Sequence, residues 1–185
     1  LMTWYRNNVV HSLALPSLVA CLMVKRRRGI TSQQLQGMVS LIYPYLALEL
    51  STDSDLSRFD QTLRVMAELQ LLHVDGEEVT PPDTEEPEHL QLTLLANLVS
   101  QTLERMFIVI HRLTEGAVTR AELLDSSRTV AQRISRLYGI NAPEFSDQRL
   151  FNQFIDTLMQ TGIIHECTDG TLRYDPVLDR VMRAA

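Results

Sequence analysis

A long apolar segment at residues 9–24 constrains the fold of this chain more than any other feature. A helix formed here is apolar on all sides, so it must be buried in protein or set into a membrane surface. We predict that this helix covers residues 7–28 and is stopped by Gly29. The apolar run is 16 residues long. Because about 20 residues are needed to cross a bilayer, and because Pro16 interrupts the run, we do not expect a spanning helix.

The two flanks of this segment carry residue types that favour a membrane surface. Aromatic and basic side chains sit at the headgroup level, and each positive charge near an anionic surface contributes roughly 1 kcal/mol. The alternative is a core helix whose cations suit the C-terminal end of the helix dipole. The candidate membrane-surface residues are Trp4, Tyr5, Lys25, Arg26, Arg27 and Arg28.

A polar cluster stands just before and within the first turn of the predicted helix. It consists of Arg6, Asn7, Asn8 and His11. A helix N-terminus with an added guanidinium favours anions, so these four residues are a candidate phosphate site. The alternative is that Asn7 or Asn8 is only the N-cap.

The overall composition excludes several classes of function. A net charge of −6 and a pI near 5.3 argue against a duplex-DNA partner, so no nucleic acid is expected. Cys21 and Cys167 are too few for a disulfide framework or a zinc site, and they indicate a reducing compartment. The sequence contains no secretory signal pattern. It begins at Leu1 rather than at Met, which favours a piece of a longer protein.

The rest of the chain reads as helices with two short β-hairpins. Capping boxes at Thr31 and Thr119 open helices. Further helices are predicted from about residue 56, over residues 89–113 and over residues 147–160, and Pro44 is expected to kink or divide the helix after Thr31. Asp-Gly turns at Gly76 and Gly170 predict the hairpins.

This order of elements occurs twice, which predicts a mainly α fold of two winged-helix-like halves. We divide the chain into a junction segment with the apolar helix (1–28), a first helix and hairpin unit (29–82), an acidic, Pro-rich connection (83–88) and a second unit (89–185). The acids of the connection are expected to be solvated rather than metal-binding.

Two stretches resemble a known family. Residues 2–11 with 13–20, and residues 127–135 with 138–145, are similar to segments downstream of the acyltransferase domain in the bacterial membrane glycerol-3-phosphate acyltransferase, the PlsB type. Order and spacing also fit, so the resemblance covers essentially the whole chain.

The resemblance implies transfer of an acyl group from acyl-CoA or acyl-acyl carrier protein to the sn-1 hydroxyl of glycerol 3-phosphate, giving lysophosphatidate. Its implied partners are those substrates, the catalytic part of the same chain and anionic membrane lipids. Its implied location is the cytoplasmic face of the bacterial inner membrane, as a peripheral protein. It implies no cofactor and no metal, and it suggests that the arginines of residues 127–136 pack onto the catalytic domain.

The family's catalytic H-x-x-x-x-D motif is absent, because no aspartate stands five residues after any of the five histidines. No nucleophile elbow, phosphate-binding loop or metal-binding histidine pair is present either. The sequence therefore predicts no catalytic residue in this chain, and a region that is inactive alone. The competing hypothesis is a tandem winged-helix module that binds nucleic acid or a protein partner.

Overall fold

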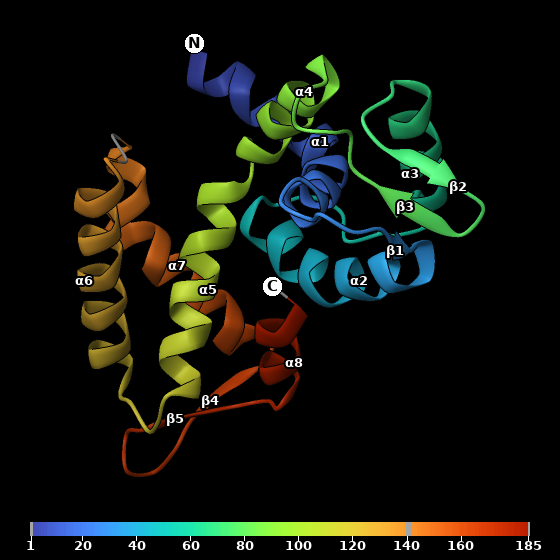
Figure 1. The fold of residues 1–185 in the computed structure, drawn as a ribbon. Helices are drawn as coiled ribbons and strands as arrows, with labels where there is room; N and C mark the ends of the chain where they lie inside the picture. The colour runs from blue at the N-terminus through green and yellow to red at the C-terminus, as the bar shows by residue number, and fades with distance from the viewer. Residues whose placement is uncertain (1, 140–141, 185) are drawn as a thin grey trace. The chain divides into compact units, whose positions relative to one another are not determined.

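The computed structural model describes residues 2–139 and 142–184, with side chains described for residues 12–139 and 142–183. Contacts within the chain divide it into two compact units, Leu1–Ser100 and Gln101–Ala184. Figure 1 shows the order of elements along the chain.

The first unit consists of helices around a small sheet. In chain order its elements are α1 (Met2–Met23), β1 (Ile30–Thr31), α2 (Ser32–Glu49), α3 (Phe59–Glu68), β2 (His73–Asp75), β3 (Glu78–Thr80) and α4 (Pro87–Asn97). The strands form an antiparallel sheet in the order β1-β3-β2. Val79 of the central strand lies opposite Ile30 on one side and Val74 on the other.

Helix α1 lies at the centre of the first unit, where it packs against α2, α3 and α4. Its second half is buried, with Ala14, Leu18, Val19, Ala20 and Met23 all at 0% exposure. Of the two alternatives left open for the apolar segment, a helix buried in protein agrees with this packing for the described side chains. Burying apolar surface of this extent is the dominant favourable term in folding.

The limits of α1 differ from the predicted 7–28. The helix begins at Met2, so Arg6, Asn7 and Asn8 lie inside it rather than at its N-terminus. It ends at Met23, before the four basic residues and before Gly29. The early end has a local cause, because the backbone N–H of Arg26 donates to the Met23 carbonyl at 2.9 Å and turns the chain away.

The second unit has a similar order of elements. They are α5 (Ser100–Thr114), α6 (Arg120–Tyr138), a 3-10 turn η1 (Pro143–Ser146), α7 (Gln148–Gln160), β4 (Ile164–Glu166), β5 (Leu172–Tyr174) and α8 (Val177–Ala184). Strands β4 and β5 are antiparallel. An isolated bridge joins Thr119 to Thr171, and the Leu172 N–H donates to the Val118 carbonyl at 2.8 Å.

Both predicted capping boxes and both predicted hairpins are confirmed. Thr31 accepts from the Gln34 N–H, and Thr119 accepts from the Glu122 N–H, while each partner side chain bonds back to the cap backbone. Each hairpin follows a helix directly. A mainly helical fold with two small antiparallel sheets is therefore correct for the described residues.

Two helices bear on the predicted boundaries. Helix α2 runs through Pro44 without being divided, so of the two effects predicted for this proline the division does not occur. The single helix predicted over residues 89–113 is two helices, because Leu98 and Val99 N–H groups bond three residues back, to Leu95 and Ala96, and end α4. By its contacts α4 belongs to the first compact unit, since it packs on α1 and its Leu92 and Ala96 are buried.

Candidate functional site

The basic turn after α1, residues 25–28, is the part of the predicted site whose side chains the structure describes. Val24 and Arg26 N–H groups bond to the Ala20 and Met23 carbonyls, both at 2.9 Å, and this fixes the turn at the helix end. Lys25, Arg27 and Arg28 are exposed. The predicted cations therefore follow the helix instead of extending it.

Arg26 differs from its three basic neighbours. Its Nε donates to the Leu22 carbonyl at 2.9 Å, and its Nη2 lies 3.2 Å from Sδ of Met38 on α2. The side chain is half-buried and satisfies a carbonyl that the helix end leaves free. Arg26 thus holds α1 to α2, and the exposed basic surface of the turn comes from the other three residues.

The basic turn leads into the sheet through Gly29. A Cβ added at Gly29 would lie 2.2 Å from Oε1 of Glu78, so the Glu78 side chain packs directly over this glycine. An alanine at this position would force Glu78 to move. The close packing of Gly29 against Glu78 of β3 therefore fixes where the chain passes from the basic turn into the sheet.

The predicted phosphate and aromatic residues fall outside the described side chains. The backbone of Trp4, Tyr5, Arg6, Asn7, Asn8 and His11 is helical within α1. Nothing in the described part of the chain relates these side chains to the basic turn, so their assignment as site residues stays a prediction.

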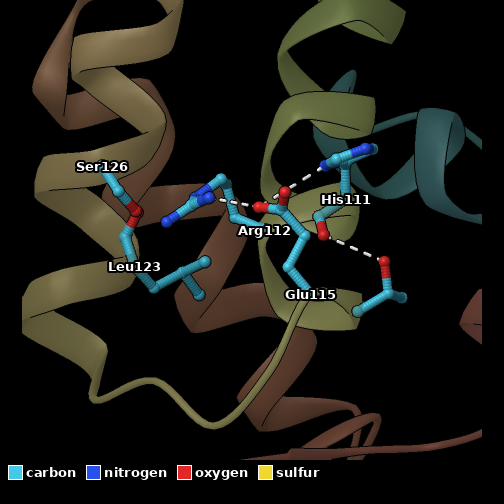
Figure 2. A network of polar contacts seen from close by, with 6 residues as sticks. His111, Arg112, Glu115, Leu123 and Ser126 are labelled. Atoms are coloured by element: carbon cyan, nitrogen blue, oxygen red, sulfur yellow. Dashed lines mark hydrogen bonds and ion pairs between the residues drawn. The ribbon is translucent and has the colours of Figure 1, made fainter.

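Polar contacts of the second unit gather at the end of α5, on the side that faces α6 (Figure 2). The Glu115 carboxylate pairs with Arg112 and lies 3.7 Å from Nδ1 of His111. Figure 2 shows Arg112 reaching toward α6, where the Ser126 hydroxyl donates to the Leu123 carbonyl at 3.2 Å. These contacts join residues close in sequence, at the end of α5 and within α6, which is the arrangement of structural contacts in helices rather than of a catalytic site.

A second link crosses from the start of α6 to α7. Nη2 of Arg120 donates to Oδ1 of Asp156 at 2.6 Å and to Oδ1 of Asn152 at 3.2 Å. Arg120 is therefore occupied by intramolecular partners. It is unlike the arginines further along α6, for which no such pairing is found among the described residues.

The remaining histidines are dispersed over the described elements. Nδ1 of His89 lies 3.1 Å from the Pro82 carbonyl, and Nε2 of His73 lies 3.5 Å from Oε2 of Glu86. His165 is exposed on β4. No group of three or more His, Cys, Asp or Glu side chains among the described residues could hold a metal ion.

The sequence did not predict the surface at the end of α6. Tyr138 follows Leu123, Ser127 and Ala131 on the core-facing side of the helix, so periodicity predicts burial. Instead Tyr138 is 78% exposed and its neighbour Leu137 is 73% exposed. Only the packing of the unit, and not the pattern of the helix, reveals this apolar end.

Across residues 2–139 and 142–184, no single helix combines the length and the apolar composition that a membrane span requires. Helices α4 and α5 reach that length and composition only when they are counted together.

Comparison with known proteins identifies relatives for nearly the whole chain. A family profile described as "Glycerol-3-phosphate acyltransferase C-terminal region" matches residues 1–167. The glycerol-3-phosphate acyltransferase of Ectopseudomonas mendocina is 36% identical over 192 residues, which cover 100% of this chain and 23% of the relative. That of Pseudomonas putida is 40% identical over 182 residues, covering 94% of this chain and 22% of the relative.

These matches define the class of protein as the C-terminal region of an acyltransferase. The chain belongs to the glycerol-3-phosphate acyltransferase family of the PlsB type, as the resemblance indicated. The chain spans about 23% of the length of the Ectopseudomonas mendocina relative, so most of a full-length family member lies outside it.

Proposed function

We propose that this chain is the non-catalytic C-terminal part of an enzyme that acylates the sn-1 hydroxyl of glycerol 3-phosphate. The donor is acyl-CoA or acyl-acyl carrier protein, and the product is lysophosphatidate. The family match over residues 1–167 carries this proposal. The absence of an H-x-x-x-x-D motif in the sequence supports a non-catalytic role, because the base that would deprotonate the glycerol hydroxyl must come from elsewhere.

The test compares the full-length protein with the 185-residue chain. Full-length protein should form lysophosphatidate from glycerol 3-phosphate and an acyl donor, and the 185-residue chain alone should form none. A full-length protein without this activity, although folded, would refute the proposal. Activity of the short chain alone would refute its non-catalytic part.

For the substrate phosphate, the proposed contacts are Arg6, Asn7, Asn8 and His11. A guanidinium, two amides and an imidazole on one short segment are suited to an anionic oxygen cluster. Arg6→Ala in the full-length enzyme should raise KM for glycerol 3-phosphate. Unchanged KM and unchanged turnover would remove Arg6 from the site.

For attachment, we propose a peripheral position on the cytoplasmic face of the inner membrane. The exposure of Lys25, Arg27 and Arg28 supports it, since solvated cations attract anionic headgroups. Trp4 and Tyr5 are the proposed aromatic contacts. Replacing the three exposed cations by Gln should weaken binding to anionic vesicles at low salt, and binding that is unaltered would oppose this role.

We also propose a winged-helix-like arrangement for each half, within the division at residues 28, 82 and 88 given above. The element order helix, short strand, two helices and hairpin supports it in the first unit, where β1 pairs with β3. The bridge from Thr119 to Thr171 takes the place of β1 in the second unit.

The same topology supports the second candidate function, a module that binds nucleic acid or a protein. The net charge of −6 disfavours DNA as its partner. A low-salt gel shift with duplex DNA tests it.

A further inference from the structure

The second half of α6 carries a basic surface on an otherwise acidic chain. Between residues 126 and 146 the sequence has three arginines and a single acid, Glu144, while the whole chain has a net charge of −6. Arg128, Arg133 and Arg136 are all exposed. They lie off the core-facing side of the helix, which is marked by the buried Leu123 and Ala131.

These three arginines are not used by the fold. Among the described residues, none of them takes part in an ion pair or hydrogen bond, in contrast to Arg120 at the start of the same helix. Packing of α6 against α7 and η1 occupies the opposite side of the helix (Figure 1). Three guanidinium groups therefore face solvent over roughly 12 Å of helix, at 1.5 Å per residue.

An apolar contact point lies beside this charge. Leu137 and Tyr138, exposed at 73% and 78%, are the most exposed large hydrophobic residues described. They occupy the last turn of α6, before Gly139 ends the helix in a left-handed conformation. Leu137 follows Arg133 by four residues and so lies beside it on the helix surface, whereas Tyr138 lies on the core-facing side. Arg side chains are enriched at the centre of protein interfaces, where a few residues carry most of the binding energy.

The shape and distribution of these groups favour an acidic protein over other anions. Small ligands bind in concave sites, whereas the exposed side of a helix is convex. A helix that lies in a lipid surface needs an apolar face along its length. Here the outward side between Arg128 and Arg136 holds the charges, and large apolar exposure is confined to the last turn. Arginine forks pair with the carboxylates of a protein surface in two-bonded geometry.

We propose that the exposed side of α6, formed by Arg128, Arg133, Arg136 and Leu137, docks the acidic carrier protein that delivers the acyl group. This inference rests on the proposed function. The three arginines attract and orient the carrier's carboxylates, and the Leu137 side chain contacts the carrier beside them. Acyl-CoA has no such protein surface, so its use does not depend on α6.

The experiment measures kcat and KM of the full-length enzyme with each donor. The variant is the triple charge reversal Arg128→Glu, Arg133→Glu and Arg136→Glu. With acyl-carrier protein, KM should rise about tenfold and lose most of its salt dependence, as expected when three exposed charge pairs are removed. With acyl-CoA, kcat and KM should not change.

The matched control reverses three exposed arginines of β5 and α8 and so changes the net charge equally. These are Arg173, Arg180 and Arg183, each replaced by Glu. This control should keep the parental KM for both donors. The triple Arg→Lys variant of Arg128, Arg133 and Arg136 should retain most of the affinity for the carrier, which a folding defect would not allow.

The alternatives give different outcomes. Equal effects on both donors would overturn the inference and indicate that α6 contacts the catalytic part of the enzyme. Equal effects together with lost binding to anionic vesicles would instead indicate a lipid contact. A parental enzyme that is inactive with either donor would refute the proposed function itself. If the triple reversal does not fold, the single variant Arg136→Gln is compared with Arg180→Gln, and equal KM values for the carrier donor would overturn the inference.

Discussion

Gln70 and Gly162 adopt the same left-handed backbone conformation, with φ angles of 59° and 74°, at the ends of α3 and α7. The hydrogen bonds around them also correspond. Leu71 and Ile163 N–H groups bond to the Met66 and Leu158 carbonyls at 2.8 and 2.9 Å, which is the bond from C″ to C3 in a Schellman motif. The two units thus end equivalent helices with the same device, once with a glycine and once without.

Alanine at Gly162 should destabilise the protein by about 1 kcal/mol, because a Cβ disfavours the left-handed conformation. Steric overlap adds little, since the nearest atom to the added Cβ is Cε1 of His165 at 3.6 Å. Gly37 is the matched control. It lies inside α2 with nothing within 4 Å of an added Cβ. Gly37→Ala should stabilise by about 1 kcal/mol through helix propensity. Urea unfolding measures the change in stability of both variants. Changes of the same sign would contradict the assignment of Gly162 to a left-handed position that disfavours a Cβ.

Glycine at Gln70 should have the opposite effect to alanine at Gly162. The substitution removes the strain of a left-handed residue with a Cβ, which should stabilise the folded protein by about 1 kcal/mol. The greater freedom of glycine in the unfolded chain reduces this gain. A higher midpoint of urea unfolding is the expected result. A lower midpoint would mean that the Gln70 side chain contributes more than its backbone costs.

The local features of this fold could be predicted from sequence, and its tertiary features could not. Thr31 with Gln34 and the Asp-Gly turns at Gly76 and Gly170 are determined by neighbours in the chain, so their patterns were sufficient. The half-burial of Arg26 depends on its contact with Met38 of another helix, which no local pattern encodes. The break after Asn97 has no Gly or Pro to announce it.

The candidate site shows the same limit. Composition alone marked the basic cluster after α1, but it could not separate the half-buried Arg26 from its exposed neighbours. The exposed end of α6 was missed because Tyr138 occupies a position that helical periodicity assigns to the core. Exposure at a helix end is decided by where the neighbouring elements stop, and that information lies in residues distant along the chain.

Acid should weaken the cap of α6 and leave the cap of α2 unaffected. The backbone N–H and hydroxyl of Thr119 both donate to Glu122 at 2.9 Å, and these bonds hold the pKa of Glu122 below its usual value of 4.5. Since the folded pKa lies below the unfolded one, the stabilisation is fully present above pH 4.5 and is lost as pH falls through the folded pKa.

Glu122→Gln tests this, because Gln34 occupies the same position in the first capping box and does not titrate. The variant should remove part of the loss of stability that sets in as the pH falls below 4.5, the unfolded value, towards the depressed folded pKa of Glu122. Its unfolding midpoint, followed by circular dichroism at each pH, is the measurement. A pH dependence identical to that of the parent chain would exclude a folded-state shift at Glu122.

Alanine at Ser127 should stabilise the second unit. The Ser127 side chain is 0% exposed, and its hydroxyl has no hydrogen-bond partner among the described residues. An unpaired buried hydroxyl costs about 1–3 kcal/mol, and alanine also has the higher helix propensity. Ser126 is the control, since its hydroxyl donates to the Leu123 carbonyl at 3.2 Å. Ser126→Ala should give a smaller gain or a loss, and a clear destabilisation by Ser127→Ala would show that its hydroxyl is paired.

Arg26 and Arg28 should respond differently to the same substitution, although both belong to one run of basic residues. Arg26→Ala removes the bond to the Leu22 carbonyl and the contact with Met38, so we expect a loss of about 1 kcal/mol in the free energy of unfolding. Arg28 is exposed, and Arg28→Ala should change stability by less than about 0.5 kcal/mol. Binding to anionic vesicles should show the reverse order, with Arg28→Ala weaker than Arg26→Ala once both are measured below their unfolding temperatures. If Arg26→Ala had the larger effect on both stability and vesicle binding, the turn would act as one structural element. The distinction between a packing Arg26 and an exposed Arg28 would then be wrong.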